Sequence, residues 1–76
     1  MFEELETVVL TKDIQNHSLK KGDIGTVVHI YHNKKIFEVE FVDASGETIA
    51  VLTLTENDIR SMDKREILHA REFASA

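Results

Sequence analysis

The segment from Leu19 to Ile30, LKKGDIGTVVHI, constrains the fold of this chain more than any other. It joins a polar turn to a long apolar strand. Gly22 suits a turn that needs a positive φ, which other residues adopt only with strain, and Gly25 relieves crowding where a strand bends. The segment therefore predicts the entry to a small, strongly bent β-sheet. It is not a phosphate-binding loop, because no glycine-rich run ends in Lys-Ser or Lys-Thr at the start of a helix.

Strand patterns recur along the rest of the chain. Ile36 to Val42 alternates apolar and acidic residues, as a half-buried strand does. β-Branched or apolar composition predicts the other strands, which are Thr7 to Thr11, Ile24 to Tyr31, Glu47 to Leu54 and a short one around Arg60 to Met62. Between the third and fourth strands lies a tight turn that ends in Gly46.

Two short helical elements are expected after the fourth strand. Thr55 is a good N-cap with Asp58 three residues on, which predicts one turn of helix. Asp63 to Ala74 has apolar side chains at helical spacing and predicts a second helix. The whole pattern predicts an all-β fold, a small five-stranded SH3-like barrel with a short 3-10 turn and a C-terminal helical extension. Residues 1–62 would form the barrel and residues 63–76 the helical tail.

Size and charge restrict the function. The chain has 76 residues, and folding at this size buries roughly 60% of the surface of the unfolded chain, so one domain is expected. Fourteen acidic and nine basic residues give a net charge of −5, which disfavours nucleic acid and favours a basic protein as partner. Cysteine is absent, which excludes disulfides and thiolate metal sites. No signal peptide or membrane span is apparent, so a cytoplasmic protein is expected.

The chain resembles a known family at four places. They are Thr7 to Leu10, Leu19 to Val28, Glu38 to Phe41 and Ile49 to Leu54. Their pattern is similar to that of a small bacterial family, domain of unknown function 4926, over about residues 6 to 62. The resemblance implies the SH3-like barrel and brings no catalytic residues. It also implies a companion of a larger partner protein, of the antitoxin or immunity type.

A looser likeness leaves a second function open. Gly22 to Val27, followed by Ile30, resembles the KOW motif of ribosomal and transcription-elongation barrels, whose loop contacts RNA or protein. The basic residues usual around that loop are reduced here to Lys20 and Lys21. An RNA- or ribosome-associated module is therefore the alternative. It would use the two basic pairs, Lys20, Lys21, Lys34 and Lys35.

No pattern predicts chemistry. His29 and His32 are three residues apart across a strand end, which does not bring two imidazoles together, and we expect no metal and no cofactor. Glu38 and Glu40 share one strand face at a spacing of about 6.6–6.8 Å, which an inverting hydrolase could use. Without an aromatic platform beside them, a solvated acidic face is favoured, and we expect no enzyme.

Surplus apolar surface points to a protein partner. A barrel interior is expected to contain Ile24, Val28, Ile30, Phe37, Val39, Phe41, Ala50, Leu52 and Leu54. The opposite faces would then carry an apolar patch of Val27, Tyr31, Ile49 and Val51. Either the tail covers this patch, within one chain or reciprocally in a homodimer, or a second copy or another protein covers it. The predicted partner-binding residues are Val27, Tyr31, Glu38, Glu40, Ile49, Val51, Ile67 and Phe73.

Overall fold

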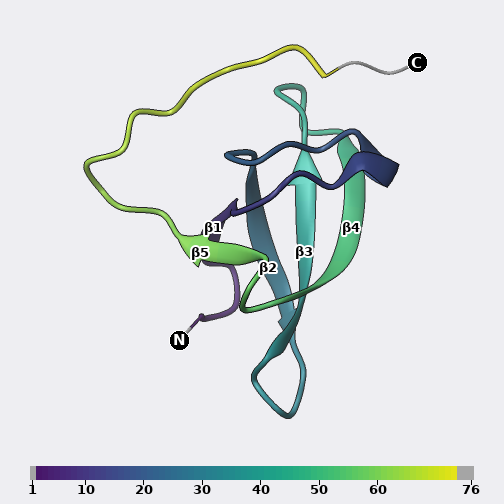
Figure 1. Ribbon diagram of the computed structural model, residues 1–76, viewed down its shortest axis with the longest axis vertical. Helices are drawn as coiled ribbons and strands as arrows, with labels where there is room; N and C mark the ends of the chain where they lie inside the picture. Colours follow the sequence, from purple (N-terminus) through teal and green to yellow (C-terminus); the bar gives the residue numbers. More distant parts are fainter. Residues whose placement is uncertain (1, 74–76) are drawn as a thin grey trace.

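A computed structural model describes residues 2–73 and shows an all-β fold (Figure 1). Its five strands form one antiparallel sheet in the order β4-β3-β2-β1-β5. The strands are β1 (Thr7–Leu10), β2 (Ile24–Ile30), β3 (Ile36–Val42), β4 (Thr48–Thr55) and β5 (Ile59–Ser61). Every predicted strand is confirmed, and no strand end differs from its predicted position by more than one residue.

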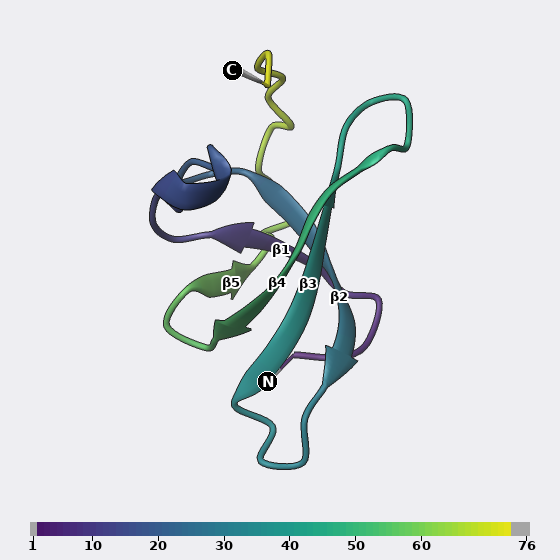
Figure 2. The same ribbon diagram turned by 90° about the vertical axis from the view of Figure 1, so that its right-hand side faces the viewer.

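The sheet curls round on itself (Figure 2). β4 and β5 are the edge strands of the sheet, yet they follow one another in the chain and are joined by the turn at residues 56–58. This short connection is feasible only because the sheet bends round on itself, as Figure 2 shows from the side. The strand order and the curl are compatible with the predicted SH3-like barrel.

The core lies inside the curled sheet. Val39 in β3 is completely buried, and the phenyl rings of Phe37 and Phe41 lie beside it at 2% exposure. Phe2 packs edge-on against Phe37, with ring centroids 5.1 Å apart. The buried residues that pack together in this core are Val8, Leu10, Leu19, Val27, Phe37, Val39, Phe41, Leu54 and Ile59.

A β-bulge in β2 reverses part of the predicted inside–outside pattern. The pairing of β2 with β3 shifts between Val27 and His29, so that Val28 is an extra residue in the ladder. Val27 is completely buried, whereas Ile24 and Val28 are 37% and 38% exposed. The assignment of Val27 to the outer patch, and of Ile24 and Val28 to the interior, is therefore wrong.

The predicted C-terminal helix is absent from the described part of the tail. After Asp63 a single turn forms, in which the Asp63 N–H donates to Glu66 Oε1 (2.7 Å) and the Arg65 N–H donates to Asp63 Oδ1 (2.8 Å). These hydrogen bonds form the N-terminal cap of a helix, but the chain from Ile67 to Phe73 is irregular. The residues from 74 onward lie outside the described part of the chain.

The expected 3-10 turn is present at a different place. Thr55 and Asp58 bond to each other as a cap would, with the Thr55 N–H donating to Asp58 Oδ2 (2.9 Å), but residues 56–58 form a plain turn. The 3-10 helix η1 (Gln15–His17) lies instead in the long loop between β1 and β2.

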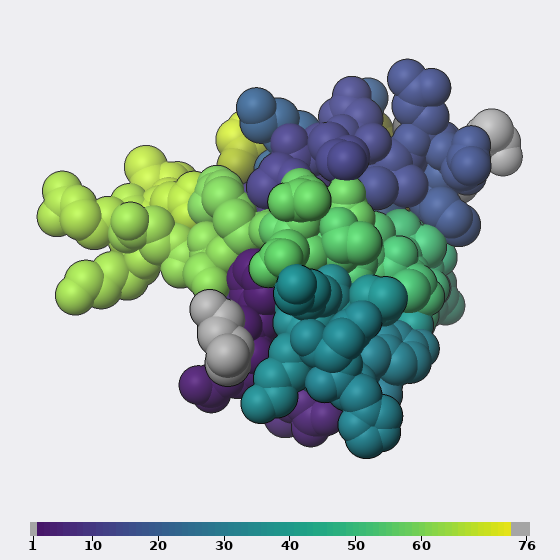
Figure 3. All heavy atoms as spheres, turned by 60° about the horizontal axis from the view of Figure 1, so that its bottom comes forward, coloured from purple at the N-terminus to yellow at the C-terminus, as the bar shows by residue number. Residues whose placement is uncertain are grey.

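The tail first leaves the body of the molecule and then returns to it. From β5 it swings outward and crosses above the end of the sheet that carries the β1–β2 loop and the β3–β4 hairpin (Figures 1 and 2). The space-filling view shows part of the tail extending away from the body (Figure 3). Ile67 is 92% exposed and Leu68 69%, so these two residues do not cover the sheet as expected.

Candidate protein-interaction face

The outer face of β2, β3 and β4 gathers half of the predicted partner-binding residues. Strand pairing sets Thr26, Glu40 and Val51 side by side in one row, and His29, Glu38 and Thr53 in the next. We call the exposed surface formed by Val28, Tyr31, Glu38, Glu40, Val51 and Thr53 the outer face.

Glu38 is held at the centre of the outer face by two hydroxyl groups. The Tyr31 and Thr53 hydroxyls both donate to Glu38 Oε2, each at 2.6 Å. The Tyr31 ring packs edge-on against His29, with ring centroids 4.7 Å apart. The carboxylate is therefore fixed in position although it lies at the surface.

The same contacts shift two pKa values. The Thr53 hydrogen bond, and after it that from Tyr31, lowers the pKa of Glu38 below its ordinary 4.5. The hydrogen bond that Tyr31 donates to Glu38 raises the pKa of the Tyr31 phenol above its ordinary 10.0. Glu38 is consequently an anion, and Tyr31 a neutral donor, at neutral pH.

A second carboxylate and two exposed valines complete the surface. Glu40 accepts a hydrogen bond from the Thr48 hydroxyl at 2.6 Å. Val28 and Val51 are 38% and 49% exposed. The outer face therefore combines two ordered acids with apolar side chains, a mixture suited to contact with basic and apolar groups of another protein.

The other predicted partner-binding residues lie elsewhere. Val27 is in the core, and Ile49 is half-buried and packs against the core, because the pairing of β3 with β4 also shifts after Phe41. Phe73 packs against the core from the tail, whereas Ile67 contacts almost nothing. Val28 and Thr53 were not among the predicted partner-binding residues. For Thr53 the sequence does contain a signal, since Thr53 and Thr55 alternate with the apolar Leu52 and Leu54 in β4.

The two lysine pairs do not form one surface. Lys20 and Lys21 precede β2, and Lys34 and Lys35 follow it, so the pairs lie at opposite ends of this strand. Seven residues of strand separate them by about 20 Å. A continuous basic surface for RNA is therefore not formed by these four residues together.

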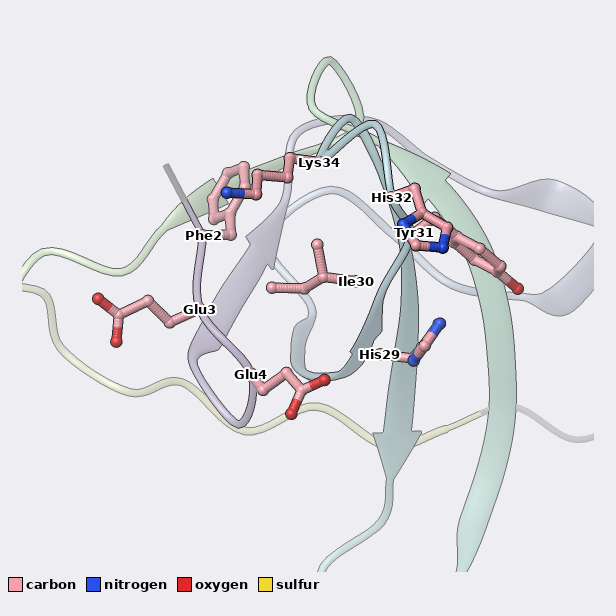
Figure 4. Close-up of a pocket in the computed structure, with 8 residues that line it drawn as sticks. All are labelled: Phe2, Glu3, Glu4, His29, Ile30, Tyr31, His32 and Lys34. Carbon is pink, nitrogen blue, oxygen red and sulfur yellow. The ribbon is translucent and has the colours of Figure 1, made fainter.

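An open depression lies at the end of β2, next to the outer face. It has a volume of about 550 Å³. Ile30 lies in its middle, with Glu3 and Glu4 on one side and His29 and His32 on the other (Figure 4). These side chains point in different directions rather than toward a common point.

Neither a metal centre nor a membrane span is found in residues 2–73. In that range no three or more His, Cys, Asp or Glu side chains are grouped to hold a metal ion. No helix there is long and apolar enough to cross a membrane.

The comparison with known families fits this architecture. The family described as Domain of unknown function (DUF4926) matches residues 4–61, which include all five strands. The chain belongs to this family. The DUF4926 region ends at β5, so the tail from Asp63 lies beyond it. No curated protein and no solved structure matches the chain significantly.

Proposed function

We propose that this DUF4926 protein is a non-enzymatic protein-interaction module whose outer face binds a basic surface of a partner protein. The observation that carries the proposal is the fixed carboxylate of Glu38, with Tyr31 and Thr53 both bonded to its Oε2. Ordering a side chain before binding reduces the entropy lost in the complex. The remaining oxygen, Oε1, is then oriented to accept from an arginine or lysine.

The neighbours of Glu38 support the same proposal. Glu40 adds a second negative charge on the same strand face. Val28 and Val51 are exposed apolar groups that a partner would cover. Covering them would remove water from around the ion pairs and strengthen them. The net charge of −5 would also speed the approach of a basic partner.

A companion role of the antitoxin or immunity type is the finer form of this proposal. In such a role a small acidic domain would bind and block a larger basic protein. The alternative is an RNA- or ribosome-associated module that uses Lys20, Lys21, Lys34 and Lys35. The separation of these pairs along β2 makes the acidic outer face the better candidate.

The test is affinity capture from a lysate of the source organism with three tagged full-length chains. They are the wild type, the double variant Glu38→Gln/Glu40→Gln, and the control Glu56→Gln, which alters an exposed acid in the β4–β5 turn. We expect one basic protein in a stoichiometric amount with the wild type and the control, and at least tenfold less with the double variant.

Two results would contradict the proposal. One is the absence of any stoichiometric protein partner with the wild type. The other is a complex destroyed by nuclease and by Lys20→Glu/Lys21→Glu, but unchanged in Glu38→Gln/Glu40→Gln, which would establish the RNA alternative.

A further inference from the structure

The tail lies along a groove that it only partly fills. The groove runs between the turn before β2 and the end of β3, and about 510 Å³ of it stays open beside the tail. Its wall on the sheet side is mostly apolar, with Leu19, Ile24, Phe41, Val42 and Ile49, and it also includes Gly22, Asp23, Asp43 and Ala44. Two acids and an apolar surface therefore line the groove.

Arg71 binds Asp23, one of the two acids of this groove, in a forked geometry. Its Nε donates to Asp23 Oδ1 at 2.8 Å and its Nη2 donates to Asp23 Oδ2 at 2.5 Å. Nη2 also donates to the backbone oxygen of Ser18 at 3.1 Å. Only a planar guanidinium can make both carboxylate contacts at once, so the groove distinguishes arginine from lysine.

The acid is positioned by the sheet end itself. The Lys20 N–H donates to Asp23 Oδ2 at 2.8 Å, and the Asp23 N–H donates to the Lys20 oxygen at 2.9 Å. The Asp23 side chain is only 17% exposed. These contacts hold the carboxylate independently of the tail, so the site is formed before an arginine enters it.

The second contact of the tail is aromatic. Phe73, two residues after Arg71, packs against the core of the sheet. In an extended chain the side chains of residues i and i+2 lie on the same side, about 6.6–6.8 Å apart. The groove thus accepts an arginine and an aromatic ring two positions apart in an extended segment.

Little else holds the tail in place. Within the described residues, no backbone hydrogen bond joins Ile67–Phe73 to the sheet. Ile67 and Leu68 remain exposed. The main contacts that a competing segment would have to displace are therefore those of Arg71 and Phe73.

We propose that this groove is a peptide-recognition site for an extended arginine-x-aromatic segment of a partner protein, and that the tail occupies it until such a segment displaces it. The acidic protein and the half-buried carboxylate of Asp23 favour a basic segment, and Arg71 and Phe73 show the chemistry that fits. This site is separate from the outer face and does not depend on the function proposed for it.

The test uses the full-length double variant Arg71→Ala/Phe73→Ala, which empties the groove. The probe is a fluorescent synthetic peptide with the sequence of residues 67–73, ILHAREF. Fluorescence anisotropy should show at least tenfold tighter binding to the double variant than to the wild type, in which the tethered tail competes. Replacing the peptide arginine by lysine, or adding Asp23→Asn to the chain, should weaken binding at least tenfold.

The controls are Arg65→Ala, which alters an exposed arginine of the same tail, and Glu38→Gln/Glu40→Gln. The first should bind the peptide as weakly as the wild type. Added to the double variant, the second should leave peptide binding unchanged. If the double variant does not fold, excess peptide added to the wild type should shift the NMR signal of the Arg71 Nε–H.

Three outcomes would overturn the proposal. The folded double variant could fail to bind the peptide at millimolar concentration, or Asp23→Asn could leave binding unchanged. Sedimentation could instead show a wild-type dimer that Arg71→Ala/Phe73→Ala abolishes. A second copy of the chain, rather than another protein, would then be the occupant.

Discussion

Gly25 in β2 faces Val39 in β3 so closely that the two strands leave no room for a side chain at Gly25. A Cβ added there would lie 2.7 Å from Val39 Cγ1 and 2.8 Å from Phe41 Cε2. Both neighbours are buried core residues and cannot move away freely. Gly25 thus leaves the space on the inner face of the sheet that the Val39 and Phe41 side chains fill.

We expect Gly25→Ala to lower the free energy of unfolding by about 1–3 kcal/mol or more through overpacking. The control is Gly46→Ala, where a Cβ meets nothing within 4 Å and only the positive φ of +87° opposes it. That substitution should cost about 1 kcal/mol. Urea denaturation measures both, and equal costs would show that the close approach is not limiting.

Val27→Ala and Val28→Ala test the β-bulge directly. Val27 is completely buried and Val28 is 38% exposed. Removing the buried methyl groups should cost roughly 2 kcal/mol of unfolding free energy, and the exposed ones under about 1 kcal/mol. The denaturant midpoints of the two variants measure these costs. A larger loss of stability in Val28→Ala than in Val27→Ala would mean that β2 has the opposite face inward.

The pKa of Glu38 tests the hydroxyl contacts of the outer face. Thr53→Ala and Tyr31→Phe should each raise this pKa toward 4.5, and Thr53→Ala should raise it more because its hydrogen bond is the larger cause. NMR titration of the Glu38 side-chain carboxyl carbon measures the change. Thr55→Ala serves as a control, and an unchanged Glu38 pKa in both variants would contradict the contact geometry.

Acid should weaken the attachment of the tail through Asp23. Burial raises the pKa of Asp23, but hydrogen bonds from Arg71 and the Lys20 N–H outweigh it, so that the pKa falls below 3.8. A depressed carboxyl pKa stabilises the folded state above the unfolded pKa, and this stability is lost as pH falls through the folded pKa.

Asp23→Asn should therefore cost roughly 1 kcal/mol at pH 7 and remove part of the loss of stability between pH 5 and pH 2.5. Denaturation at a series of pH values measures this difference. Asp63→Asn is the matched change in the exposed turn of the tail. If Asp23→Asn and the wild type lose the same stability in acid, the Asp23–Arg71 pair does not hold the tail.

The tail shows why a local pattern can fail. A cap forms between Asp63 and Glu66 at the start of the predicted helix. Two hydrogen bonds from the Arg60 guanidinium, at 2.8 and 2.7 Å, join this cap and lower the pKa of Glu66 to about 2. The helix does not continue, because so short a helix is marginal alone while Arg71 and Phe73 find partners on the sheet.

Local patterns in the sequence specify the strands. The alternation in Ile36–Val42, the β-branched runs and the glycine positions are local signals, and they were sufficient to place all five strands. Gly22, with a φ of +96°, has the turn role that the sequence predicted. Which side of β2 faces inward, and where the tail lies, depend on contacts between distant parts of the chain. Strand side chains alternate with a period of two, so one extra residue at Val28 reverses the faces, and the contacts of Arg71 and Phe73 join parts of the chain that no local pattern connects.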